Sequence, residues 1–153
     1  PDAVDVLRAA GDFDGLGALF REDDVVLVGT RPEDEARREV EGLGMRVFDS
    51  ASLREAGPSA IARRALGLLT ENTLGFWIHL DWDVIDRVEM PAVDSPEADG
   101  PTFRQLTPLL RHLVKSPRCV GMEVTIYDPD LDPTGICADR IVNCLERVLE
   151  LKR

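Results

Sequence analysis

Two aspartates that follow the most hydrophobic stretch of the sequence have the residue type and spacing for chemistry. Asp81 and Asp83 come directly after the apolar run FWIHL at 76–80. Side chains two residues apart on an extended backbone point to the same side, so these carboxylates are expected to converge. Carboxylates held together repel each other unless a cation or a proton lies between them. Because carboxylate oxygens suit Mg²⁺ or Mn²⁺, the pair is a candidate metal site, with a solvated turn as the alternative.

The elements that must position this pair follow the pattern of a parallel α/β protein. Four short apolar runs, mostly continuous and not alternating, are typical of strands that are covered on both faces. Amphipathic helical patterns lie between and after them. The expected strands are 25–29, 45–48, 76–80 and 119–124, and the expected helices are 32–43, 58–69, 102 to a stop at 116–117, 138–151 and a short one at 2–10. This alternation implies right-handed crossovers and a mainly parallel sheet, with the chemistry beyond the carboxyl ends of the strands.

Length, charge and cysteine content exclude several classes of protein. The 153 residues are expected to form a single domain, 1–153, with a buried core. The net charge of −11 argues against nucleic acid and anionic membranes as partners, because phosphate groups need a basic face. No apolar run approaches the ~20 residues of a membrane span. The three cysteines lack zinc-ligand spacing and are expected to be reduced, partly buried thiols in a cytoplasmic protein.

Several segments, in a fixed order, resemble the signature of the ureohydrolases, the arginase and agmatinase family. They are 28–31 (VGTR), 79–86 (HLDWDVID), 90–96 (MPAVDSP), 100–104 (GPTFR), and 121–124 (GMEV) with Asp128-Pro129. The first looks like the family's Gly-x-Arg strand end. The next three are similar to its Asp-x-Asp-x-x-Asp strand end, Pro-rich loop, Gly turn and helix. The last resembles its final core strand and turn, so the match covers most of the chain.

The resemblance implies the carboxyl-terminal portion, about half, of an arginase-like domain: an incomplete three-layer α/β/α fold with a mainly parallel sheet. It implies that Asp81 and Asp83 are the second-half ligands of a dinuclear Mn centre. Such a centre would hydrolyse C–N bonds of a guanidino or amidine compound. Asp86 would be a structural carboxylate that stiffens the loop. The implied partners are the missing first half of the domain or further copies in a homo-oligomer.

The sequence also departs from the family pattern. The family's remaining ligands, a His in a Gly-Gly-Asp-His turn and an Asp-x-His-x-Asp cluster, have no counterpart here. His79 and His112 are expected to be structural or surface-facing, so the chain alone is expected to be inactive. Ile126 falls where arginase-like members place the glutamate that grips the guanidinium, and Glu123 falls where they have Asp. Because an apolar residue cannot pair with a guanidinium, the identity of the substrate stays open.

Two other functions also remain open. The missing ligands and Ile126 favour a non-catalytic, truncated or degenerate relative that is retained for packing or assembly. A less favoured alternative is an Asp-x-Asp phosphohydrolase, with Asp81 as the nucleophile and Asp83 as the acid–base. A Pro-rich loop after the pair, and the lack of downstream Lys and acidic motifs, argue against it.

Overall fold

Parallel strand pairs form the centre of the molecule. The computed structural model describes residues 21–150 of the chain. β1 (Val26–Val28) pairs in parallel with β2 (Arg46–Phe48), and β3 (Phe76–Asp81) pairs in parallel with β4 (Cys119–Thr125). Within the described residues the two pairs are separate two-stranded sheets. The parallel α/β class is therefore confirmed. The sequence suggested a single sheet, but β1 and β2 form one sheet and β3 and β4 form another.

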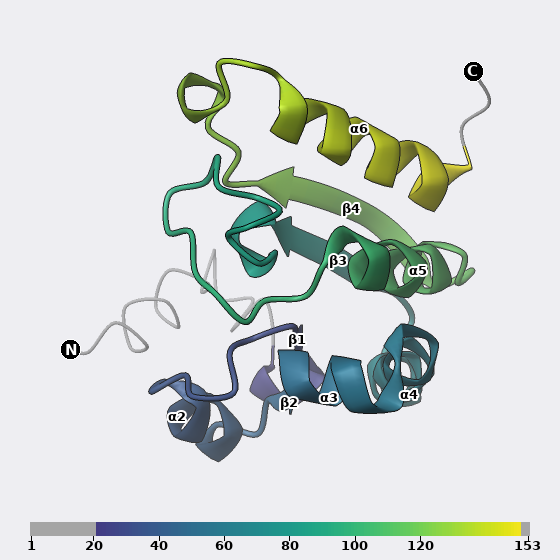
Figure 1. The fold of residues 1–153 in the computed structure, drawn as a ribbon. Coiled ribbons are helices and arrows are strands. Elements are labelled where there is room, and N and C mark those ends of the chain that lie inside the picture. Colours follow the sequence, from purple (N-terminus) through teal and green to yellow (C-terminus); the bar gives the residue numbers. More distant parts are fainter. Residues whose placement is uncertain (1–20, 151–153) are drawn as a thin grey trace, which may run out of the picture.

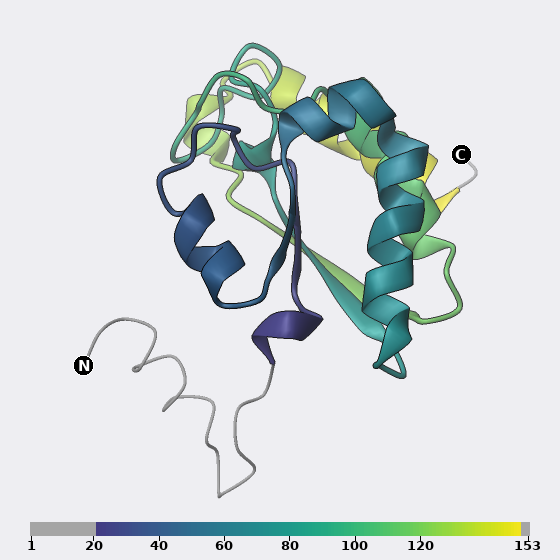
Figure 2. The same ribbon diagram turned by 90° about the horizontal axis from the view of Figure 1, so that it is seen from below.

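Helices lie on both sides of the strands (Figure 1). Figure 2 shows α2 on one side of β1 and β2, and α4, α5 and α6 gathered on the other side. The helices are α2 (Arg37–Gly42), α3 (Ser50–Ala56), α4 (Pro58–Glu71), α5 (Phe103–Val114) and α6 (Ile136–Leu149), and the short 3-10 helices are η1 (Glu22–Asp24), η2 (Trp82–Val84) and η3 (Pro129–Leu131). This order gives helix, sheet and helix layers, as expected of the fold class.

The hydrophobic core lies between β3 and the helices that pack against it. Its members come from β3, α4, α5, α6 and the segment that follows β3, and include Ile78, Leu80, Ile61, Ala65, Leu106, Leu109, Leu110, Leu113, Cys144, Val148, Trp82 and Ile85. Each fully buried Leu or Ile contributes about 1.5–3 kcal/mol. Thr102 begins α5 with a capping box, in which Thr102 and Gln105 satisfy each other's backbone N–H groups.

Strand β3 has one buried face and one exposed face. Phe76, Ile78 and Leu80 face the core, whereas Trp77 and His79 are exposed. The expectation that both faces of this strand are covered is therefore wrong for residues 21–150. The Trp77 ring lies over Gly121 of β4, where an added Cβ would be only 2.1 Å from a ring carbon.

Several element boundaries differ from those expected. The helix expected at 32–43 begins at Arg37, because the Asp34 carboxylate accepts a hydrogen bond from the Ala36 N–H and forms a turn before it. Helix α3 was not predicted, although Asp49 caps it by accepting from the Ser52 N–H. The final helix begins at Ile136, two residues early. The helix expected at 2–10 and the end expected at residue 151 lie outside the described residues.

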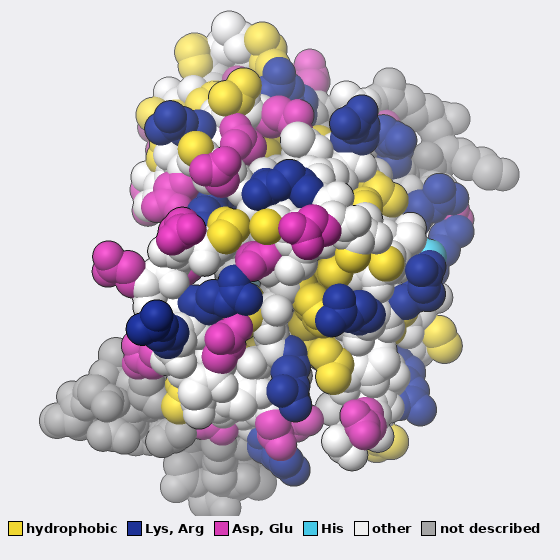
Figure 3. Space-filling view, turned by 60° about the horizontal axis from the view of Figure 1, so that its bottom comes forward, with side chains coloured by type: hydrophobic (Ala, Val, Ile, Leu, Met, Phe, Trp, Pro, Cys, Tyr) yellow, Lys and Arg dark blue, Asp and Glu magenta, His cyan; other side chains and the backbone are white. Residues whose placement is uncertain are grey.

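The surface carries charges of both signs. On the face in Figure 3, acidic and basic side chains are interspersed, and hydrophobic side chains gather near its middle. The cysteines are free thiols: Cys137 and Cys144 are buried and Cys119 is partly buried, as predicted. None of the helices in residues 21–150 is both long and apolar enough to cross a bilayer.

Candidate metal centre

Asp81 and Asp83 lie where β3 ends. The alternation of β3 places Asp81 on the exposed face, in register with Thr125 of β4. After Asp81 the chain turns into the 3-10 helix η2, which contains Asp83. The turn places Trp82 in the core, with an exposed fraction of 1%, and its ring centroid lies 5.8 Å from that of Phe103. The backbone from Asp81 to Asp83 is therefore not extended as predicted, and both aspartates belong to the same strand end.

The carboxylate of Asp83 is in an unfavourable environment for a negative charge. Burial raises its pKa most, and the charges of Asp81, Glu97 and Asp94 raise it further. The positive charge of Arg31 opposes this shift. A cation next to this cluster would relieve the repulsion, which is the electrostatic condition of a metal site.

Asp81 is held by two side chains on the same sheet face. The Thr125 hydroxyl donates to Asp81 Oδ1. His79 Nε2 lies 3.2 Å from the same oxygen, and His79 Nδ1 lies 2.9 Å from Glu123 Oε1. The hydrogen bond with Glu123 is the main cause of the raised pKa of His79. His79 is exposed, as predicted, but its contacts with both Asp81 and Glu123 were not predicted.

Arg31 organises the loop that contains Asp83. Its guanidinium donates to the backbone carbonyl oxygens of five loop residues, and its side chain is only 17% exposed. The acceptors are Asp83, Val84, Ile85, Glu97 and Ala98. The resemblance placed Gly29-Thr30-Arg31 at a strand end, but this role of Arg31 was not predicted. The signal was an arginine two residues after a strand-ending glycine.

Asp86 stiffens the same loop, as the resemblance implied. Its carboxylate accepts hydrogen bonds of 2.9 Å from the backbone N–H groups of Val88 and Asp99. The Asp86 N–H donates to the Pro101 carbonyl, 3.1 Å away. These bonds fix both ends of the Pro-rich loop next to Gly100, where a Cβ would be only 2.4 Å from a backbone oxygen.

Ile126 follows β4 with a left-handed backbone. Its φ is +68°, an uncommon conformation for a β-branched residue, and its side chain is 39% exposed. Glu123 lies on the exposed face of the sheet, bonded to His79. The histidine on α5, His112, is exposed, in agreement with the prediction.

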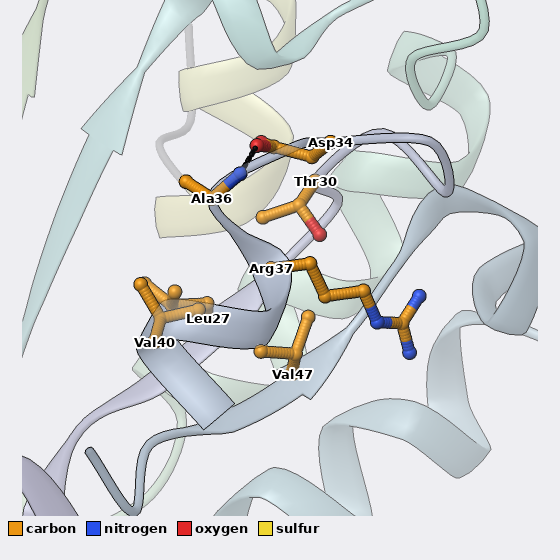
Figure 4. A pocket seen from close by; sticks show the side chains of 7 residues that line it. All are labelled: Leu27, Thr30, Asp34, Ala36, Arg37, Val40 and Val47. Atoms are coloured by element: carbon orange, nitrogen blue, oxygen red, sulfur yellow. Dashed lines mark hydrogen bonds between the residues drawn. The ribbon is translucent and has the colours of Figure 1, made fainter. Parts of the chain in front are cut away.

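A small pocket beside β1 offers no room for a substrate (Figure 4). It measures about 50 Å³, close to the space of one or two water molecules. The Thr30 hydroxyl in it is buried and has no hydrogen-bond partner among the residues that the structure describes. The lining residues are Leu27, Thr30, Asp34, Ala36, Arg37, Val40 and Val47.

The carboxylates that fit a cation do not form a complete set of ligands. In residues 21–150, no group of three or more His, Cys, Asp or Glu side chains is arranged to hold a metal ion. A metal ion at Asp81 and Asp83 would therefore need further ligands from outside these residues.

Comparison with known sequences identifies relatives that are about twice as long. The sequence profile of the Arginase family matches residues 16–149. An arginase of Brevibacillus brevis is 27% identical over 125 residues, which make up 81% of this chain and 42% of the relative. The N(omega)-hydroxy-L-arginine amidinohydrolase of Streptomyces lavendulae is 32% identical over 126 residues, or 81% of this chain and 42% of the relative.

Solved structures share the fold. An arginase from Bacillus subtilis superimposes with a TM-score of 0.81 at 22% identity, and the match covers 92% of this chain and 53% of that one. A formimidoylglutamase from the same species gives a TM-score of 0.78 at 19% identity, with 85% and 41% covered. The chain thus spans about half the length of the proteins that it matches. Since the family profile matches most of its length, this chain belongs to the Arginase family.

Proposed function

We propose that this chain is the carboxyl-terminal part of a Mn-dependent, ureohydrolase-like enzyme that cleaves a C–N bond of a guanidino or amidine compound. The observation that carries the proposal is the Asp81 and Asp83 pair at the carboxyl end of β3, in a member of the Arginase family. Burial and nearby carboxylates raise the pKa of Asp83, so a cation beside it would be electrostatically favourable.

The described residues would have two roles in such a site, binding the metal and orienting its ligands. Asp81 and Asp83 would hold Mn²⁺, and a bound metal pair would supply a hydroxide at neutral pH. Thr125 and His79 orient the Asp81 carboxylate. Arg31 fixes the backbone on which Asp83 lies by donating to its carbonyl oxygen. Residues next to the metal ligands thus restrict their motion, as supporting hydrogen bonds do at other metal sites.

The names of relatives support a substrate class and not one compound. They include arginases, an N(omega)-hydroxy-L-arginine amidinohydrolase, a proclavaminate amidino hydrolase and a formimidoylglutamase. Each name describes hydrolysis at a guanidino, amidino or formimidoyl group. Ile126 provides no charge for a guanidinium, so the specificity of this chain would differ from that of members with a glutamate there.

The missing ligands would come from the other half of the domain. The chain spans about half the length of its relatives. Strands β1 and β3 belong to separate sheets, and the face with Trp77, His79 and Glu123 is exposed. Unpaired strand edges and uncovered faces are normally covered by other elements or by further copies. We therefore include the first half of the domain, or a homo-oligomer, as the partner.

A second possibility is a non-catalytic relative retained for assembly. The incomplete donor set in residues 21–150 and the apolar Ile126 favour it. Membership of the Arginase family gives no support to the phosphohydrolase alternative.

A Mn²⁺ titration followed by NMR tests the metal assignment on the chain itself. Paramagnetic broadening of backbone signals is expected to centre on residues 79–84 and Thr125. The double variant Asp81→Asn, Asp83→Asn is expected to abolish it. The control Asp139→Asn, an exposed carboxylate on α6, is expected to leave it unchanged. Broadening that centres on the acidic segment 128–132, or that persists in the double variant, would contradict the assignment.

Activity requires the completed domain. The chain is joined to the first half of the domain and assayed for amine or urea release from a panel of guanidino and amidine compounds. Activity that depends on Asp81 and Asp83 supports the enzyme. A completed protein that binds Mn²⁺ without turning over any member of the panel supports the non-catalytic alternative.

A further inference from the structure

A groove between α5 and α6 lies apart from the aspartate pair. Its volume is about 360 Å³, within the range of pockets that hold small ligands. Its lining residues are Phe103, Arg104, Thr107, Arg140, Asn143, Cys144 and Arg147. Neither Asp81 nor Asp83 lines it, and the proposed metal chemistry makes no use of it.

Helical spacing explains why these side chains share one groove. On α6, Arg140, Asn143, Cys144 and Arg147 are separated by three or four residues and form one stripe. On α5, positions 104 and 107 form the facing stripe. Cys144 and Thr107 are buried at its base, with their sulfur and oxygen atoms 3.3 Å apart. The three arginines are exposed at its rim.

The positive charge of the rim is not neutralised by ion pairs in the described part of the chain. Neither Arg104 nor Arg147 has a carboxylate within 4.0 Å among residues 21–150, and Arg140 donates to a backbone oxygen, that of Glu89. By contrast, Arg111 on the same helix as Arg104 is paired with Glu150. Three arginines thus surround one groove in a chain with a net charge of −11.

The acidic residues of α6 lie outside the lining of the groove. Asp139 and Glu146 belong to the same helix, but neither lines the groove. Phe103 adds an aromatic surface next to the guanidinium groups. The lining therefore combines an apolar wall with several planar cationic groups.

We propose that this groove binds a small organic anion through its carboxylate or phosphate oxygens. Guanidinium groups donate paired, charge-assisted hydrogen bonds to both kinds of oxyanion. The Phe103 ring accommodates the uncharged body of the ligand. The groove is a binding site separate from the metal centre, and it exists whether or not the metal centre is functional.

Calorimetric titration of the full 153-residue chain with citrate, and separately with inorganic phosphate, tests this site. Saturable binding of at least one probe is expected. The probe that binds with the lower Kd shows whether the groove prefers carboxylate or phosphate oxygens. Replacing one arginine removes charged hydrogen bonds, so Arg104→Gln and Arg147→Gln are each expected to weaken binding about tenfold. Arg63→Gln, an exposed arginine on α4 outside the groove, carries the same charge change and is expected to bind as the unmodified chain does.

Three outcomes would overturn the proposal. The first is the absence of saturable binding of either probe to a chain that melts cooperatively. The second is an equal loss of affinity in Arg63→Gln, which would indicate a general effect of net charge. The third is a change in sedimentation from a larger to a smaller species in Arg147→Gln, because the groove would then hold an acidic side chain of a second copy. Thermal melts of the variants show that a loss of binding is not a loss of folding.

Discussion

Arg31 is predicted to contribute about 3 kcal/mol to stability through the loop that it organises. Three of its contacts are part-buried and short: Nε to Ala98 O at 3.1 Å, Nη1 to Val84 O at 3.0 Å and Nη2 to Asp83 O at 3.1 Å. A charged hydrogen bond contributes ~1.5–3 kcal/mol, and partial exposure reduces this to about 1 kcal/mol each. Arg31→Met removes all three and is expected to lower the free energy of unfolding by about 3 kcal/mol.

Arg31→Lys separates the geometry of the guanidinium from its charge. The lysine ammonium cannot direct hydrogen bonds to carbonyl oxygens as widely separated as those that the planar guanidinium reaches. It is therefore expected to keep one of the three contacts. The expected loss is therefore about 2 kcal/mol, despite the unchanged net charge. Urea unfolding followed by far-UV circular dichroism measures both variants. Arg63→Met is the matched control, and its expected change is within ~0.5 kcal/mol.

Arg31→Lys with the stability of the unmodified chain, to within ~0.5 kcal/mol, would contradict this prediction. That result would mean that the charge of Arg31, and not its set of directed hydrogen bonds, supports the loop. An equal loss in Arg31→Met and Arg63→Met would mean that the loop carbonyls are satisfied without the arginine.

Three further predictions concern titration and packing. Burial and Asp81 raise the folded pKa of Asp83, so the chain loses stability as pH rises from the unfolded pKa of about 3.9 through the folded one. Asp83→Asn is thus expected to raise the melting temperature of the metal-free chain at pH 7, with no difference below about pH 4; a lower value at pH 7 would contradict this. His79 has a folded pKa raised by Glu123, so its contribution is complete below the unfolded pKa of about 6.5 and is lost as pH rises through the folded value. His79→Gln should abolish this decline in a series of melts at successive pH values, and an unaltered pH profile would argue against it. Gly100→Ala is expected to cost about 2 kcal/mol or more in urea unfolding, because its Cβ would lie 2.4 Å from a backbone oxygen; a neutral result would show that the loop can move.

The strands and long helices were predictable because their hydrophobic patterns have the period of the element. All four strands lie within a residue or so of the expected positions, and α5 begins directly after its capping residue Thr102. The helix boundaries that were predicted wrongly are those where an aspartate side chain accepts a hydrogen bond from a nearby backbone N–H group. The Asp34 turn delays α2, and the Asp49 cap starts a helix too short for its periodicity to be recognised. The division of the sheet depends on pairing partners and leaves no mark in a single strand.

The sequence indicated which carboxylates belong to the candidate site but not what supports them. Asp81 and Asp83 were found because they are adjacent in sequence and resemble a family motif. The contacts of Asp81 with Thr125, and of Arg31 with loop carbonyls, join residues that are more than 40 positions apart. Such contacts depend on the tertiary fold, so a motif of consecutive residues cannot reveal them. Asp86 was the exception, because a familiar loop pattern surrounds it.

The two indoles of this chain differ in their access to water. Trp77 is 52% exposed on the uncovered sheet face, whereas Trp82 is 1% exposed in the core. A soluble quencher such as iodide would therefore suppress the emission of Trp77 and spare that of Trp82. A protein segment that covered this face would protect Trp77 and shift its emission to shorter wavelength. The emission of Trp77, with that of Trp82 as the internal reference, would therefore report whether another protein segment covers the exposed face.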